Sequence, residues 1–208
     1  MHRLRTNEQT EPLNDNAFIA NSSVLSFDER TLPTVSESSI SCSSQVRDAI
    51  LSATGALTLP APPLQRALTD AFFEQVYHDY PVVELEDISA SDSSILLQQG
   101  VFLAGSLMRR DSDSLKLSQS LYEKIKTLIY LNYEPDSISI LKTLCLLSCW
   151  SVKPPDKMSL DGPWHWTGVA SRIALEMGLH QESTYINNPF ASSLRKIFWH
   201  LYVCVDIE

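Results

Sequence analysis

Apolar residues recur at steps of three and four along this chain from Leu64 onward, and this spacing restricts the fold most strongly. Leu64, Leu68 and Phe72 illustrate the pattern, which places side chains on one face of an α-helix. No stretch shows a sustained period of two, as a half-buried strand would. The segment PVVELEDI, residues 81–88, could form one short strand, but a single strand has no partner to bond. The sequence therefore predicts an all-α domain, a multi-helix bundle or an irregular helical array.

Six segments carry the helical spacing, and one of them shows its end signals clearly. The helices are expected within residues 63–80, 95–108, 114–132, 134–152, 161–178 and 192–208. The fourth is apolar on nearly every side and is expected to be the central helix. The fifth would be capped by Asp161, carry Pro163 in its first turn and end at a left-handed Gly178. Leu179 would then fold back toward Ala174.

Residues 1–63 have a different composition from the remainder. They are rich in Ser, Thr, Asn, Asp and Glu, with isolated apolar residues and no sustained period. A short helix could form around Val46 to Leu51, and TLPAPP at residues 58–63 is typical of an extended proline linker. We predict a disordered Ser-rich acidic arm and linker over 1–63, and a helical domain over 64–208.

Charge and cysteine usage exclude several protein classes. The formal net charge of -9 and the pI near 5.0 oppose binding to phosphate backbones or anionic membranes. No leader is expected, because the N-terminal residues 1–16 contain no apolar core region, and no membrane span is expected, because the later apolar stretches are broken before the roughly 20 residues that a span needs. Three of the four cysteines lie in apolar runs, where a thiol usually serves as a small hydrophobe; the four are Cys42, Cys145, Cys149 and Cys204. A soluble intracellular protein in a reducing compartment is predicted.

The segment DGPWHWTGVASRIALEMGLHQE, residues 161–182, could serve chemistry or packing. His165 could be a general base or a metal ligand with His180 or His200, and Cys145 with Cys149 could form half of a zinc site. No histidine pair has the spacing of a metal site, and no second cysteine pair completes four ligands. We therefore favour packing and buried thiols over a metal or catalytic site.

Packing accounts for the residue types of this segment. Gly168, Ala170 and Ala174 would let another helix approach closely, while larger neighbours fill the remaining space. Trp164 and Trp166 point in different directions on the first turn. At least one is expected to close the end of the bundle with its indole N–H hydrogen-bonded.

The same segment, followed by LRKIFWHLY at residues 194–202, resembles the regulatory middle homology region of fungal zinc-cluster transcription factors. In that family a tryptophan precedes a Gly-x-Ala-x-x-x-Ala helix ending in Leu-Gly-Leu-His, and a basic pair followed by aromatic-Trp starts the next helix. Met177 replaces the usual leucine at similar volume. The motif positions here are Trp164, Trp166, Gly168, Ala170, Ala174, Gly178, Leu179, His180, Phe198 and Trp199.

The resemblance covers about Leu64 to Tyr202 and extends upstream more loosely. LTDAFFEQVYHDYPVV is similar to the opening helix of the family, and SSILLQQGVFLAGSLM is similar to its second helix. SCWSVKPPDKMSLDGPWHW resembles members near the cutinase and acetamidase regulators. The C-terminal residues of the chain depart from the family pattern, because Asp206 is followed by Ile-Glu and not by Arg. We therefore expect a truncated, N-terminal part of the family domain, with much of the regulatory pocket missing.

The resemblance implies a nuclear, non-enzymatic regulator of transcription. Its partners would be proteins of the transcription machinery or a homologous regulator, and self-association is also expected. The family's six-cysteine zinc cluster is not expected here, since Cys42 alone precedes the domain, so no cofactor is predicted and DNA would be reached through a missing module or a partner. The alternatives are a helical interaction scaffold, or a small-molecule-binding helical domain, with no role in transcription.

The DSDS segment at Asp111 to Ser114 could be phosphorylated, although solvated surface is its default interpretation.

Overall fold

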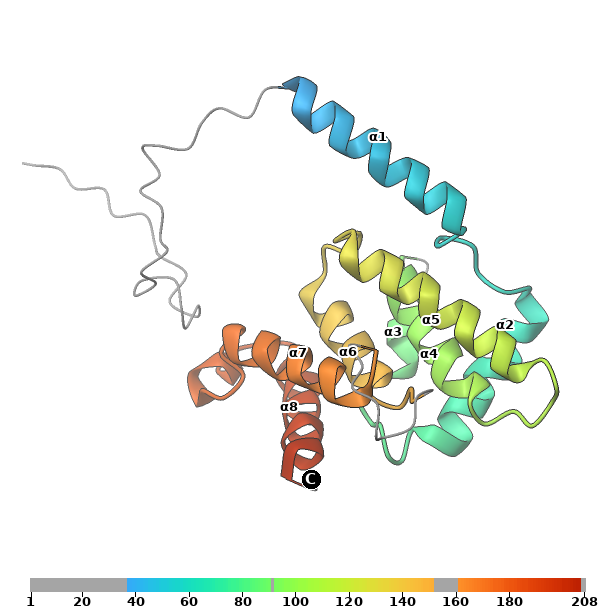
Figure 1. Cartoon of the computed structure of the whole chain (residues 1–208). Helices are drawn as coiled ribbons and strands as arrows, with labels where there is room; N and C mark the ends of the chain where they lie inside the picture. The colour runs from blue at the N-terminus through green and yellow to red at the C-terminus, as the bar shows by residue number, and fades with distance from the viewer. Residues whose placement is uncertain (1–36, 91, 152–160, 207–208) are drawn as a thin grey trace, which may run out of the picture.

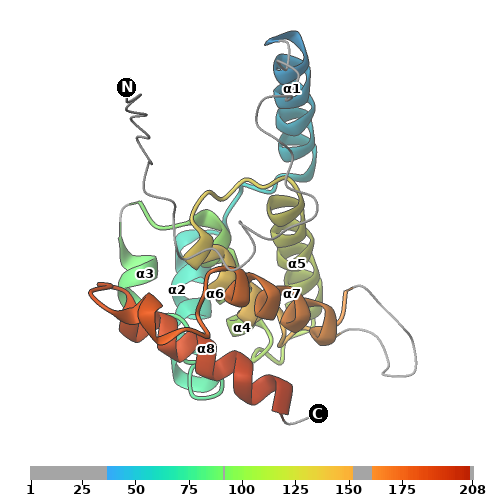
Figure 2. The same ribbon diagram turned by 90° about the vertical axis from the view of Figure 1, so that its left-hand side faces the viewer.

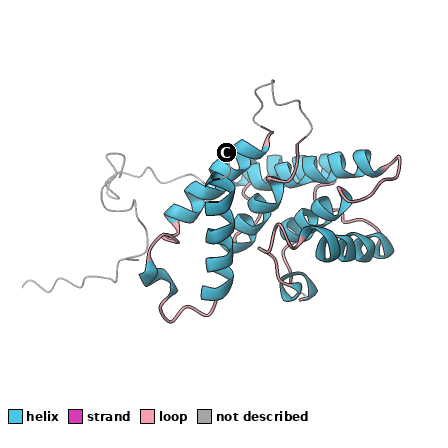
Figure 3. Ribbon diagram, turned by 90° about the horizontal axis from the view of Figure 1, so that it is seen from below, coloured by secondary structure: helices cyan, strands magenta, loops and turns pink. Residues whose placement is uncertain are grey.

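The computed structural model describes residues 37–90, 92–151 and 161–206, and the regular secondary structure of these residues is all helical. Figure 3 shows only helices and loops in this part of the chain, which confirms the all-α prediction. The elements are α1 (Glu37–Thr54), α2 (Pro62–Ala71), the π-helical η2 (Phe72–Val76), α3 (Leu85–Ser89), α4 (Ile95–Ser106), α5 (Ser114–Tyr130), α6 (Ser137–Leu147), α7 (Pro163–Glu176), the 3-10 helix η3 (Glu182–Tyr185) and α8 (Ala191–Asp206).

Helix α4 lies at the centre of the bundle (Figures 1 and 2). Ten of its 12 residues are buried, and α2, η2, α5 and α6 all pack against it. The prediction placed the helix within 134–152 at the centre, whereas its structural counterpart α6 forms the next layer and carries α7 and α8 on its outer side. The apolar surface of α4 explains the difference, because it surrounds the whole helix and can accept neighbours from several directions.

Two glycines of α4 allow its neighbours to come close. A Cβ atom built on Gly105 would lie 2.0 Å from the carbonyl oxygen of Leu68, so α2 and α4 cross in backbone contact. A Cβ atom on Gly100 would lie 3.2 Å from Cγ2 of Thr143 in α6. The α2–α4 crossing requires the absence of a side chain at Gly105, whereas a methyl group at Gly100 would be a tight contact with side chains of α6.

The 81–88 segment forms a turn and most of α3, and no strand. The turn before α3 buries Val82 and Val83, and a capping box begins the helix. In this box the Glu84 N–H donates to Oδ2 of Asp87 at 2.7 Å. A hydrophobic run of this length is compatible with either a strand or a buried turn. The capping box at Glu84 starts a helix and so excludes the strand.

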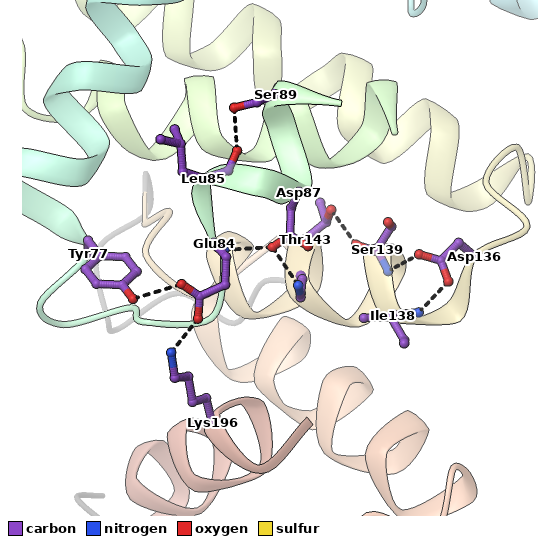
Figure 4. Close-up of polar contacts among 11 residues, drawn as sticks. Tyr77, Glu84, Leu85, Asp87, Ser89, Asp136, Ile138, Ser139, Thr143 and Lys196 are labelled. Carbon is purple, nitrogen blue, oxygen red and sulfur yellow. Dashed lines mark hydrogen bonds and ion pairs between the residues drawn. The ribbon is translucent and has the colours of Figure 1, made fainter. Parts of the chain in front are cut away.

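Two lysines from other helices bind the start of α3, and Figure 4 shows one of them, Lys196, beside Glu84. Nζ of Lys142, which is buried on α6, lies 2.6 Å from Oδ2 of Asp87. Lys196 of α8 pairs with Glu84, whose other carboxylate oxygen accepts the Tyr77 hydroxyl at 3.4 Å. These contacts join α3, α6 and α8 at one point of the structure.

The folded part of the chain begins earlier than the predicted boundary at Leu64. Helix α1 spans Glu37–Thr54, which is much longer than the helix expected around residues 46–51. It extends away from the bundle in Figures 1 and 2, and its Leu51 is buried. The predicted arm over 1–63 is therefore corrected in its last part, while residues 1–36 lie outside the described residues.

The segment after α1 is held on the bundle by hydrogen bonds from distant helices. Ala56 is fully buried, and its carbonyl accepts the amide of Gln99 at 2.6 Å. The Thr58 carbonyl accepts Nζ of Lys124 at 2.7 Å. Pro62 then begins α2 in the first-turn position that proline tolerates. Pro62 therefore starts a helix and is not part of an extended linker. The hydrogen bonds from Gln99 and Lys124 join residues that are far apart in the sequence, so they leave no periodic signal in it.

Glycine-to-alanine substitutions at two helical positions should have opposite effects. Gly105→Ala should lower the free energy of unfolding by about 1–3 kcal/mol, because the new methyl group overlaps the Leu68 carbonyl. Gly168→Ala in α7 is the matched control, since nothing lies within 4 Å of the position that its new methyl group would take. It should raise stability by about 1 kcal/mol through helix propensity. Urea unfolding followed by circular dichroism measures both, and equal effects would contradict the proposed crossing.

Candidate functional site

The two motif segments meet at a corner formed by α7, η3 and α8. Helices α7 and α8 pack against each other and against α6, while η3 contacts α8 (Figure 1). Leu194, Ile197 and Leu201 are the buried residues of α8 that face this layer. The corner therefore brings together the Gly-Leu-His end of one segment and the aromatic-Trp part of the other.

Helix α7 ends in a Schellman motif. Gly178 has φ 72°, in the left-handed region. The Leu179 N–H donates to the Ala174 carbonyl at 2.9 Å, and the Gly178 N–H donates to that of Leu175 at 3.0 Å. Leu179 is buried, so the predicted fold-back toward Ala174 is confirmed. This stop gives the chain its turn from α7 into η3.

Helix η3 is joined to the Schellman turn by side-chain hydrogen bonds. The Thr184 hydroxyl donates to the Gly178 carbonyl at 2.7 Å, and the Tyr185 hydroxyl donates to the Leu179 carbonyl. Both residues are buried at the edge of the core. Burial raises the pKa of Tyr185, so its hydroxyl stays protonated and continues to donate.

Arg195 of α8 holds η3 from the other side. Its guanidinium group pairs with both carboxylate oxygens of Glu182 and lies 4.1 Å from the ring centroid of Tyr185. The hydrogen bonds to Arg195 lower the pKa of Glu182, and those to Glu182 raise the pKa of Arg195. Both side chains are solvent-exposed, so the pair orients η3 and contributes little to stability.

The outward side of α8 carries exposed aromatic residues between two grooves. Trp199 is 64% exposed and Tyr202 is 54% exposed, and their rings meet edge to face at 5.8 Å between centroids. Both line a groove of about 270 Å³ whose other walls are Leu179, His180, Glu182, Tyr185, Arg195 and Phe198. Trp199 also lines a second groove of about 550 Å³, together with His78, Asp79, Pro81, Ser192, Arg195, Lys196, His200 and Val203. We call the surface around Trp199 and Tyr202 the α8 face.

Trp166 links the first turn of α7 to α5 through a series of hydrogen bonds. Its indole N–H donates to the Tyr122 hydroxyl at 3.1 Å, as predicted for one of the two tryptophans. The Tyr122 hydroxyl donates to Oδ1 of Asp161 at 3.1 Å, and Nζ of Lys126 lies 2.9 Å from the same oxygen. Burial raises the pKa of Tyr122 and keeps the hydroxyl neutral within this chain of bonds.

The structure corrects two expectations for α7. The N-cap is Gly162 without a side-chain bond, because the Asp161 carboxylate is engaged by α5. Gly168 faces open space and does not permit a close helix approach. Ala170 and Ala174 are buried in the layer against α6, whereas Trp164 is 69% exposed.

The three histidines considered for chemistry lie in different surroundings. His165 is half-buried with its ring 4.8 Å from that of Trp166, and His180 is exposed at the smaller groove. His200 is buried beside the Tyr80 ring at 4.9 Å, and burial lowers its pKa. Within the described residues no three His, Cys, Asp or Glu side chains are placed to hold a metal ion.

Cys145 and Cys149 are packing residues of α6 and its end. Cys145 is fully buried, and Sγ of Cys149 donates to the Leu146 carbonyl at 2.7 Å. Burial raises the pKa of Cys149 to about 12, so its thiol is protonated at neutral pH. No helix in the described part of the chain is both long and apolar enough to cross a membrane.

Comparison with known proteins identifies the family. Residues 69–204 match the model of the fungal specific transcription factor domain. The chain belongs to this family. The match contains α7, η3 and most of α8, so the resemblance found in the Gly-Leu-His and LRKIFWHLY segments is confirmed.

Curated relatives of the chain are named as regulators of transcription. The chain is 28% identical over 174 residues to cutinase transcription factor 1 beta of Fusarium vanettenii, covering 72% of this chain and 19% of the relative. It is 30% identical over 166 residues to the acetamidase regulatory protein of Aspergillus fumigatus, covering 73% of this chain and 21% of the relative. The chain thus spans about a fifth of the length of these relatives. No solved structure matches it.

The sequence motif did not reveal the partners of its basic pair. Arg195 pairs with Glu182 and Lys196 pairs with Glu84, which lies 112 residues away. Glu182 ends the 161–182 segment, whereas Glu84 lies just outside the recognised segments. The basic pair itself indicated that such partners exist, because charged residues on a partly buried helix usually have an oppositely charged partner. The sequence spacing does not identify which carboxylates these partners are.

Replacing Gly178 should destabilise the corner. Gly178→Val should lower the free energy of unfolding by about 1–3 kcal/mol, because a β-branched residue resists the left-handed conformation. Gly178→Asn is the matched control and should cost less, since asparagine tolerates this conformation. Thermal melting of the three proteins tests the prediction, and a valine variant that melts with the wild type would contradict it.

Native-state alkylation should distinguish Cys145 of α6 and Cys149, two residues after this helix, from reactive thiols. At pH 7.5 iodoacetamide should modify Cys145 and Cys149 only after unfolding, because both are inaccessible or held as the neutral thiol. Peptide mapping by mass spectrometry, with and without urea, resolves the individual cysteines. Rapid modification of Cys149 in the folded protein would show that the thiol is more exposed than the structure places it.

Proposed function

We propose that this chain regulates transcription as the helical regulatory part of a fungal transcription factor, and that it acts by contacting another protein. The family match over residues 69–204 carries the proposal. It is supported by relatives that are named transcription factors or regulatory proteins. A nuclear location follows from this role and is part of the proposal.

The charges of the corner support a binding role without catalysis. Arg195 and Lys196 are each paired with a carboxylate that orients a neighbouring element, so these charges already have structural partners. The chain as a whole carries a formal charge of -9, which opposes direct contact with DNA. We propose that DNA is reached through another module or a partner, and that this part needs no cofactor.

The α8 face is the surface best suited to a protein partner. Trp and Tyr are enriched among the residues that dominate binding energies at protein interfaces, and here both are exposed on one helix. The grooves on either side of Trp199 offer recesses for apolar side chains of the partner. The occupant we propose is a protein of the transcription machinery or a homologous regulator that presents an apolar surface.

A tethering assay tests this function. The whole chain is fused to an unrelated DNA-binding domain, and expression of a reporter carrying the matching site is measured in a fungal host. The fusion should change reporter output relative to the DNA-binding domain alone. Trp199→Ala with Tyr202→Ala should remove this change, because losing an aromatic hot spot costs about 2 kcal/mol or more, a factor of about 30 in affinity.

Trp164→Ala provides a matched control for the double variant. Trp164 is about as exposed as Trp199 but lies at the start of α7 and lines neither groove. It should keep wild-type reporter output, and all variants should melt normally. A wild-type fusion without effect would contradict the proposed function, while equal losses at Trp164 and Trp199 would contradict the proposed surface.

A further inference from the structure

The loop between α4 and α5 presents a serine after two arginines, away from the α8 face. Its sequence is RRDSDS, with Arg109 and Arg110 three and two residues before Ser112. All three residues are exposed, and the loop lies at the opposite side of the bundle from α7, η3 and α8 (Figure 1). The family motif does not use this loop.

Ser112 is the accessible hydroxyl of this loop. Its hydroxyl has no hydrogen-bond partner among the described residues, whereas Ser114 donates to the Asp111 carbonyl at 2.8 Å and begins α5. Residues 109 and 110 have no regular structure, and 111–113 form a bend and turn. A short segment of this kind can adopt the extended form that an enzyme acting on it requires, without unfolding a helix.

We propose that Ser112 is a phosphorylation site for a protein kinase that selects arginines before the target serine. The two guanidinium groups match the carboxylates that such a kinase presents, since charge patterns determine kinase–substrate pairing. Ser112 Oγ attacks the γ-phosphorus of MgATP, and a new Oγ–P bond forms as the bond to the bridging oxygen of ADP breaks. The hydroxyl proton passes to the catalytic aspartate of the kinase, and ADP leaves.

Ser112 lies between the carboxylates of Asp111 and Asp113, which repel a phosphate, and close to two arginines and a helix N-terminus, which attract it. A phosphoserine adds a charge of about −1.5 to −2, close to Arg109, Arg110 and the first turn of the 17-residue α5. In the unmodified protein Arg109 pairs with Asp111, and a phosphate on Ser112 competes with that carboxylate for the guanidinium group. Phosphorylation therefore changes the pairing of the α4–α5 loop and leaves the α8 face intact.

Thr69 provides an internal comparison. Arg66 lies three residues before it, so the pair repeats part of the arginine signal. Thr69 is half-buried within α2, and its phosphorylation would require that helix to unfold. Accessible loop structure, together with the arginines, selects Ser112 over Thr69.

The test uses the full chain, MgATP and the purified catalytic subunit of an arginine-directed serine kinase, with phosphosites mapped by mass spectrometry. We expect phosphate on Ser112, and its loss at that position in Ser112→Ala. Arg109→Gln and Arg110→Gln should each lower kcat/KM by about tenfold, the loss of one charge-assisted hydrogen bond. Arg66→Gln is the matched control and should leave the rate unchanged.

Several results would overturn the proposal. These are an unmodified Ser112 in the wild-type chain, phosphate on Thr69 in place of Ser112, or equal rates for the Arg109, Arg110 and Arg66 variants. Circular dichroism of each variant checks that the fold is retained. Because the assay measures phosphate transfer and no reporter output, its failure does not depend on the proposed role in transcription.

Discussion

The backbone contact between α2 and α4 is the constraint on which the rest of the structure depends. The Leu68 carbonyl occupies the place that a side chain on Gly105 would take, and a residue with a Cβ atom would separate the two helices. Because α4 is apolar on every side, this close crossing leaves its other surfaces free for α5 and α6. Helix α6 in turn provides the surface on which α7 and α8 pack.

Ion pairs position the outer layer but do not provide most of its stability. The Lys142–Asp87 pair is largely buried, so removing either partner would leave an uncompensated charge and be costly. The Lys196–Glu84 and Arg195–Glu182 pairs are more exposed and individually weak. Burial of Leu194, Ile197 and Leu201 is therefore the main stabilising contribution to α8, and the exposed pairs orient it relative to α3 and η3.

The family motif combines two kinds of residues at one corner. Gly178, Leu179 and the alanines of α7 build the turn and the packed layer, so their residue types follow from backbone conformation and volume. Trp199 has its side chain outside that layer, and packing within the described chain does not account for its size. This division between an inner scaffold and an outer aromatic surface agrees with the partner-binding role that we propose.

The helical class, the six main helices and the Gly178 stop could be predicted from the sequence, because periodicity and end signals involve residues close together in the chain. Tertiary structure alone decided which helix is central, that Gly105 and not Gly168 lies at a crossing, and that Asp161 binds α5 and does not cap α7. It also decided the burial of Ala56 against Gln99, 43 residues away, and the pairing of Lys196 with Glu84. These features depend on contacts between distant segments, for which local spacing carries no information.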